Sequence, residues 1–103
     1  MDEKKTTSPE KKAALEAIRE EFKGTDGPTQ KTRLLEALKR LWAVSTYEAR
    51  LYLDIYYPPA RIKELRRDGY SIRTDWKIVT TEAGIDHRIG LYVLESGVPN
   101  ALA

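Results

Sequence analysis

Hydrophobic residues recur with helical spacing near the start of the chain. Leu15, Ile18 and Phe22 fall on one side of a helix that we predict over residues 8–23. Ser8 is a favourable N-cap, and the proline after it suits the first helical position, where its missing N–H costs no hydrogen bond. With so few large apolar residues, this helix is expected to be stable only when packed. The helix could be a loosely attached appendage. Its apolar face could form a dimer seam, and packing of that face on its own domain is at least as well supported.

A stronger pattern of the same period follows a turn-forming segment. The stretch "GTDGP" at 24–28 combines glycines with an aspartate and a proline, which predicts a turn or a short linker. Residues 29–42 then predict a helix with a broad apolar stripe. The stripe consists of Leu34, Leu35, Leu38, Leu41 and Trp42.

A short helix is predicted next by a local hydrogen-bonding motif. Ser45 and Glu48 have the spacing of a capping box, in which each side chain accepts a hydrogen bond from the other residue's backbone N–H. The helix is expected to run from Thr46 to Leu53 and to end before the two prolines, because the residue before a proline is pushed out of the α region.

The tandem prolines open a further predicted helix. Pro58 or Pro59 suits its first position, Ile62 and Leu65 provide an inward face, and Gly69 is a favourable stop.

After this helix the hydrophobic period changes from helical to alternating. Residues 70–79 predict a strand, residues 80–88 a polar loop and residues 89–95 a second strand that completes a β-hairpin. Val44 is a candidate for a short third strand beside the hairpin. Residues 96–103 are expected to form a flexible tail.

The order of these elements predicts an α+β fold that is mainly α. It is the order of a winged helix-turn-helix: three core helices and a C-terminal β-hairpin wing, here preceded by an extra N-terminal helix. We therefore divide the chain into an N-terminal helix and linker (1–28), a winged helix-turn-helix domain (29–95) and a flexible tail (96–103).

Composition supports a single globular domain and locates the positive charge. The chain has 103 residues, 41% hydrophobic and 33% charged, with a net charge of +2. Residues 1–23 hold six bases and six acids, whereas residues 58–77 hold six bases and three acids. The chain has no cysteine, no targeting segment and no apolar run near the roughly 20 residues that cross a bilayer. A cytoplasmic location without membrane contact is expected.

Specific stretches also resemble a known family. "RLLEALKRLWAVSTYEARLYLDIYYPPARIKELRRDGYSIRT" and the later "HRIGLYVL" are similar to small winged helix-turn-helix proteins common in bacteriophage and prophage genes. The resemblance covers roughly residues 31–94, and "YYPP" departs from the commoner "H-P-x-A". It implies a DNA-binding fold in a regulator, but it supplies no operator, partner or catalytic residue, and it does not cover residues 1–28.

The third helix of the winged domain is the main candidate for DNA contact. An Arg near its N-terminus can bind guanine bidentately, an acid can accept from cytosine, and bases further along suit phosphates. The candidates here are Tyr57, Arg61, Lys63, Glu64, Arg66 and Arg67. The alternative is an ordinary solvated helix, in which Arg61 or Arg66 pairs with Glu64 or Asp68.

The hairpin supplies further candidates. Arg73 and Lys77 share a strand face and Arg88 lies by the loop, so all three suit the DNA backbone. Charges that merely protect a sheet edge explain them equally well.

Most aromatic residues are expected in the core rather than stacked on bases. Trp42 continues a leucine stripe, and Trp76 and Tyr92 lie in predicted strands. Tyr56 and Tyr57, in the turn before the prolines, are the expected exceptions.

The sequence offers little for catalysis. Asp86 and His87 stand together without a nucleophile or second base, so we predict no enzyme and no catalytic residue, cofactor or metal. We predict sequence-specific binding of double-stranded DNA by a phage or mobile-element type regulator of transcription or recombination. The alternative is a winged-helix module that binds a host protein without binding DNA, which the modest net charge favours.

Overall fold

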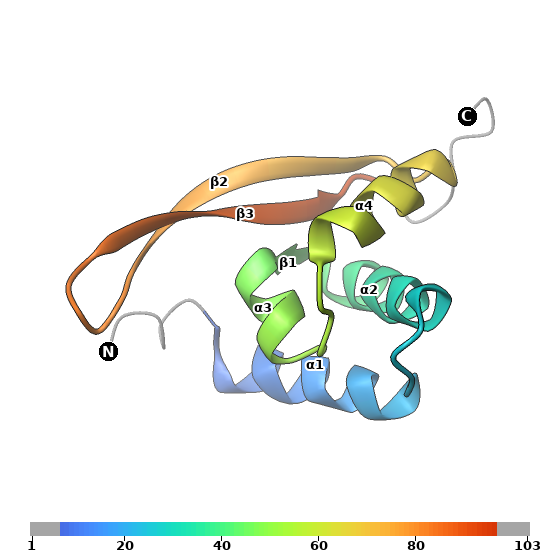
Figure 1. Ribbon diagram of the computed structural model, residues 1–103, viewed down its shortest axis with the longest axis horizontal. Helices are drawn as coiled ribbons and strands as arrows, with labels where there is room; N and C mark the ends of the chain where they lie inside the picture. Colours follow the sequence, from blue (N-terminus) through green and yellow to red (C-terminus); the bar gives the residue numbers. More distant parts are fainter. Residues whose placement is uncertain (1–6, 97–103) are drawn as a thin grey trace.

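The computed structural model describes residues 7–96, and its elements follow the predicted order (Figure 1). The helices are α1 (Pro9–Glu21), α2 (Gly27–Leu41), α3 (Thr46–Leu51) and α4 (Pro58–Arg67), and the strands are β1 (Ala43–Ser45), β2 (Ile72–Thr80) and β3 (Asp86–Leu94). The helices gather at one end of a long twisted hairpin, which extends well beyond them. The predicted α+β architecture is confirmed, and the predicted tail from residue 97 lies outside the described residues.

Side-chain caps set where the first two helices begin. The Ser8 hydroxyl accepts from the Lys11 N–H at 3.1 Å, as expected of an N-cap. Asp26 caps α2 by accepting from the N–H and the hydroxyl of Thr29, both at 3.0 Å, and these hydrogen bonds hold the pKa of Asp26 below its ordinary value. Helix α2 therefore begins at Gly27, and the prediction that residues 24–28 form a linker is wrong for its last two residues. Proline is tolerated there because the first helical turn has no partner for its N–H.

Helix α1 is part of the core rather than a loose appendage. Leu15 and Ile18 are 0% and 1% exposed, and Phe22 packs against the same cluster. The apolar face that was a candidate dimer seam is thus occupied by the protein's own domain. The core also includes Leu34, Ala37, Leu38, Val44, Ala49, Leu53, Ile55, Ile62, Leu65, Ile72, Tyr92 and Leu94.

A buried arginine joins distant parts of the helical bundle. Arg33 is 1% exposed and donates to the carbonyl oxygens of Phe22 at 2.6 Å and Gly24 at 3.0 Å, which connect α1 to α2. It also donates to those of Leu53 at 2.7 Å and Asp54 at 3.1 Å, in the turn before α4. Burial lowers the pKa of Arg33, but a guanidinium stays charged at any physiological pH. One side chain therefore satisfies the backbone at the two connections that place α1 and α4.

The predicted capping box is present and is extended by α1. The Ser45 N–H donates to Oε1 of Glu48 at 2.9 Å, and the Glu48 N–H donates to Oγ of Ser45 at 2.9 Å. Glu48 is 2% exposed and also accepts from the Thr7 hydroxyl at 2.6 Å, while Nζ of Lys11 lies 3.0 Å from its Oε1. The helix ends at Leu51, two residues before the predicted end at Leu53.

Replacing Glu48 with alanine is expected to lower the free energy of unfolding by about 3 kcal/mol, since a cap is lost and buried partners are left unpaired. Urea unfolding followed by circular dichroism measures the change. Glu36→Ala is the matched control, because the one ion pair of Glu36 within residues 7–96 is a surface pair with Arg40 at 3.2 Å. Equal losses in both variants would contradict the role given to Glu48.

The sheet confirms one prediction and corrects two. Its order is β1-β3-β2, all antiparallel, with Val44 opposite Tyr92 in the expected third strand. The loop is shorter than predicted, because Asp86, His87 and Arg88 belong to β3. Trp76 was expected in the core but is 59% exposed, as its part of the hairpin lies beyond the helices.

Trp42 is also misplaced by the sequence pattern. It ends α2 in the left-handed conformation, with a φ of 70°, and is 51% exposed. The change of backbone direction turns its side chain out of the leucine stripe that it continues in sequence.

Candidate nucleic-acid interface

The tandem prolines form the first turn of α4. Tyr57 is the N-cap residue and makes no side-chain capping hydrogen bond, and Pro58 and Pro59 take the first two helical positions. Neither proline has an N–H, and the Ala60 N–H donates to the Tyr57 carbonyl at 3.2 Å. The helix start therefore offers few free N–H donors, so it is poorly suited to binding a phosphate by itself. Tyr57 is 57% exposed, as expected of an aromatic outside the core.

The outward face of α4 is defined by what the helix buries. Ile62 and Leu65 are each 1% exposed and pack into the core. The exposed positions recur at helical spacing on the other side, and they are Pro59, Lys63, Arg66 and Arg67. We call Lys63, Arg66 and Arg67 the α4 basic stripe.

The acids of this helix are neutralised by bases outside the stripe. Glu64 accepts from Nη2 of Arg61 at 2.9 Å, and Asp68 accepts from Nζ of Lys31 on α2 at 2.7 Å. Within residues 7–96, no member of the α4 basic stripe makes an ion pair with an acid. The alternative prediction was that Arg61 or Arg66 pairs with an acid of this segment. Arg61 does pair with Glu64, whereas Arg66 pairs with neither Glu64 nor Asp68.

Arg61 is directed toward the protein rather than toward solvent. Its side chain is 19% exposed, and a Cβ built on Gly27 would lie 3.0 Å from its Nη1. Its Nε is buried, with no hydrogen-bond partner in the described residues. Contact of Arg61 or Glu64 with a base remains a prediction, and it requires their ion pair to open.

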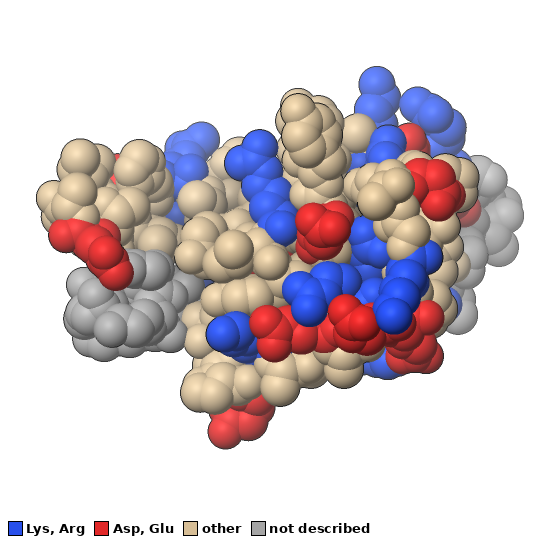
Figure 2. Space-filling model, turned by 60° about the horizontal axis from the view of Figure 1, so that its bottom comes forward, with Lys and Arg blue, Asp and Glu red and all other residues tan. Residues whose placement is uncertain are grey.

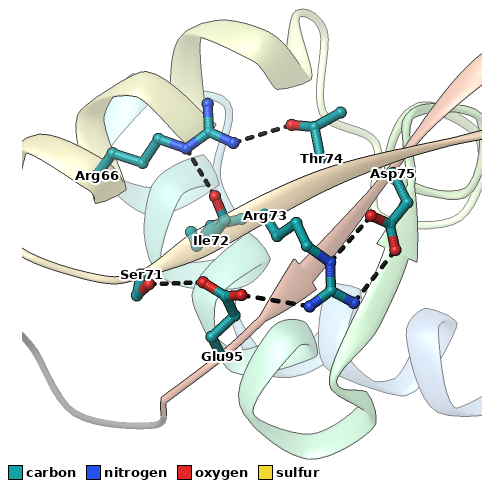
Figure 3. A network of polar contacts seen from close by, with 7 residues as sticks. All are labelled: Arg66, Ser71, Ile72, Arg73, Thr74, Asp75 and Glu95. Atoms are coloured by element: carbon teal, nitrogen blue, oxygen red, sulfur yellow. Dashed lines mark hydrogen bonds and ion pairs between the residues drawn. The ribbon is translucent and has the colours of Figure 1, made fainter.

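Arg66 links α4 to the hairpin (Figure 3). Its Nε donates to the Ile72 carbonyl at 2.9 Å and its Nη2 to the Thr74 hydroxyl at 2.9 Å. The side chain is held in one orientation by neutral partners, so its positive charge is not neutralised.

Arg73 is the opposite case in the same view. It donates to Asp75 at 2.9 and 3.2 Å and to Glu95 at 3.3 Å, and Glu95 in turn accepts from the Ser71 hydroxyl at 2.8 Å. These carboxylates, Asp75 foremost, raise the pKa of Arg73. Arg73 therefore adds little positive field at the surface.

The other two bases of the hairpin point to opposite faces. Lys77 pairs in register with Ile89, and Arg88 pairs with Ile78, so the alternation of side chains separates them. The guanidinium carbon of Arg88 lies 4.4 Å from the centroid of the Trp76 ring, a cation–π contact that orients the charge. Arg73 and Lys77 thus share a strand face, as predicted, whereas Arg88 lies on the other face of the hairpin.

Elsewhere the charges are mixed. Figure 2 shows acidic and basic side chains intermixed along the face that carries α1. Arg40 and Glu21 on this part of the molecule form a two-bond ion pair at 3.0 and 3.2 Å. The α4 basic stripe differs from that face, because the nearby acids Glu64 and Asp68 pair with bases outside the stripe.

One further base was missed by the sequence analysis. Arg50 on α3 is exposed, has no acidic partner within residues 7–96, and lines a depression with Gln30, Asp54 and Tyr56. In a helix-turn-helix the helix before the recognition helix crosses the DNA backbone. The local sequence around Arg50 does not predict that this side chain is exposed, because its exposure depends on how α3 packs against the rest of the protein.

The order of helices and strands, with an exposed basic third helix of the bundle α2–α4, defines a winged helix-turn-helix protein. The chain belongs to the family whose model, a winged helix-turn-helix domain, matches residues 29–97. Comparisons with curated proteins and with solved structures give no match. The matched region spans α2 to β3, and this class of domain indicates DNA binding.

Other kinds of site find no support in the part of the chain that is described. None of its helices is long and apolar enough to span a bilayer. Residues 7–96 also contain no group of three His, Cys, Asp or Glu side chains that could hold a metal ion.

Proposed function

We propose that the protein binds double-stranded DNA with α4 in the major groove and regulates transcription or recombination as a small phage or mobile-element type protein of the cytoplasm. The observation that carries this proposal is the α4 basic stripe. Lys63, Arg66 and Arg67 are exposed without acidic partners in residues 7–96, although Glu64 lies on the same helix and Asp68 follows directly after it. Releasing counterions from phosphates is the main source of affinity for such a surface.

The three bases have different places along the helix and therefore different proposed roles. Of the three, Lys63 lies nearest the N-terminus of α4, the end of a recognition helix that approaches base edges. Arg67 is in the last turn, where a base meets phosphate more readily. Arg66 is held by β2 and would connect DNA contact to the position of the wing.

Arg50 and Arg88 would extend the surface on either side. Arg50 lies on the helix before the recognition turn, and Arg88 lies on the wing with its charge oriented by Trp76. We do not assign this role to Arg73, because two carboxylates already pair with it.

The proposal is tested by selecting bound sequences from random duplex DNA and measuring affinity by fluorescence anisotropy at several salt concentrations. Lys63→Ala is expected to weaken binding to the selected site by about tenfold or more while affecting random duplex less. Arg67→Ala is expected to weaken both alike and to reduce the slope of log affinity against log salt by about 1.

Lys23→Ala is the matched control, since it removes one charge from the segment just after α1, where Lys23 pairs with Glu20 at 3.4 Å. Absence of binding to every duplex at low salt would refute DNA binding. A pull-down of host proteins would then test the alternative function.

A further inference from the structure

Strand β2 leaves one edge of the sheet unpaired. The strand order β1-β3-β2 places it at an edge, and within residues 7–96 no strand pairs with its outer side. Figure 1 shows β2 along the outer side of the hairpin, with α4 near its first residues only. A nine-residue edge is a template for pairing with another strand unless something blocks it.

The hydrogen bonds of the hairpin show which backbone groups point outward. Pairing runs without interruption from Ile72 opposite Leu94 to Thr80 opposite Asp86. Arg66 reaches the Ile72 carbonyl from outside the hairpin, so this carbonyl points away from β3. By alternation, the N–H and C=O groups of Thr74, Trp76 and Ile78 also point away.

The sequence of this edge is complementary to itself. If a second β2 aligns antiparallel with Trp76 opposite Trp76, the outward groups of Thr74 and Ile78 meet their partners in the other copy. Asp75 of each copy then lies opposite Lys77 of the other. These are the closely spaced pairs of an antiparallel ladder, with Cα atoms roughly 4.5 Å apart. Lysine on an edge normally repels a second copy of itself, whereas here each lysine meets a carboxylate.

We propose that the protein forms a symmetric homodimer by antiparallel pairing of β2 with β2 about Trp76, which joins the two sheets into one. Within residues 7–96 Lys77 makes no ion pair in the monomer. Asp75 accepts from Arg73 through both carboxylate oxygens, and each oxygen keeps a further lone pair with which to accept from Lys77 of the other copy. The proposal assigns Lys77 to an interface between copies instead of to DNA. It does not depend on DNA binding and can be tested on the protein alone.

A pair of complementary variants tests this geometry. Asp75→Lys places only lysines at the two positions, and Lys77→Asp places only aspartates, so each variant repels itself. Mixed together, the two variants restore both opposite-charge pairs. Sedimentation velocity on each protein alone and on the equimolar mixture measures the association.

Wild type is expected to dimerise, and each variant alone to do so at least about tenfold more weakly. The mixture is expected to recover to within about threefold of wild type, which also shows that both variants are folded. A monomeric wild type, two variants that dimerise as wild type does, or a mixture that fails to recover would each overturn the proposal.

Discussion

Replacing Arg33 with methionine is expected to lower the free energy of unfolding by about 4 kcal/mol, because four backbone carbonyl oxygens lose at once the charged donor that this buried side chain supplies. Methionine keeps much of the side-chain volume, so the loss reports mainly the hydrogen bonds. For a domain of this size the melting temperature should fall by about 20 °C. Thermal and urea unfolding followed by circular dichroism measure both quantities.

Arg40→Met is the matched control for this prediction. It makes the same substitution on the same helix, but Arg40 is exposed and its partners, Glu21 and Glu36, lie on the surface. Exposed ion pairs contribute little, so the control should remain close to wild type. If the two variants lose the same stability, Arg33 does not hold the connections as described.

Reversing the charge of the stripe should have the largest effect on DNA binding. The double variant Lys63→Glu with Arg67→Glu is expected to lower affinity for duplex DNA more than about 100-fold, because attraction to phosphates becomes repulsion and a base contact is lost. Fluorescence anisotropy at low salt measures it. Neither side chain makes an ion pair within residues 7–96, so the fold should be retained.

A second double variant separates this effect from net charge. Lys12→Glu with Lys23→Glu changes the total charge equally, but Lys12 lies on α1 and Lys23 lies just after it. It should weaken binding far less, since charges more than a Debye length from the DNA are largely screened. Equal losses in the two double variants would contradict a binding surface on α4.

The elements of the fold are predictable because their signals are local. The prolines that begin α4, the Ser45–Glu48 capping box and the alternation of the hairpin each act through neighbours a few residues away. These features were confirmed with shifts of one or two residues at the helix ends. The prediction that Trp42 is buried failed because the backbone changes direction at the end of α2. The prediction that Trp76 is buried failed because the helices do not cover that part of the hairpin.

The candidate site was predictable as a helix but not as a set of residues. Composition could not tell that Asp68 is paired by Lys31 from α2, or that Arg61 is turned toward Gly27. It likewise could not show that Glu95, from beyond the end of β3, joins the nearby Asp75 in pairing with Arg73, or that Arg88 lies over the ring of Trp76. Each of these outcomes depends on a partner far away in the chain.

The sequence by itself determined the order of helices and strands, the caps that start them and the helix that carries the positive charge. Periodicity and capping are properties of a few consecutive residues, so they can be read without the fold. Only the tertiary structure decided that α1 belongs to the core, that Arg33 is buried, and that Lys63 and Arg67 remain without acidic partners in the described residues. Burial and ion pairing are set by which segments come together, and that is a property of the packed chain.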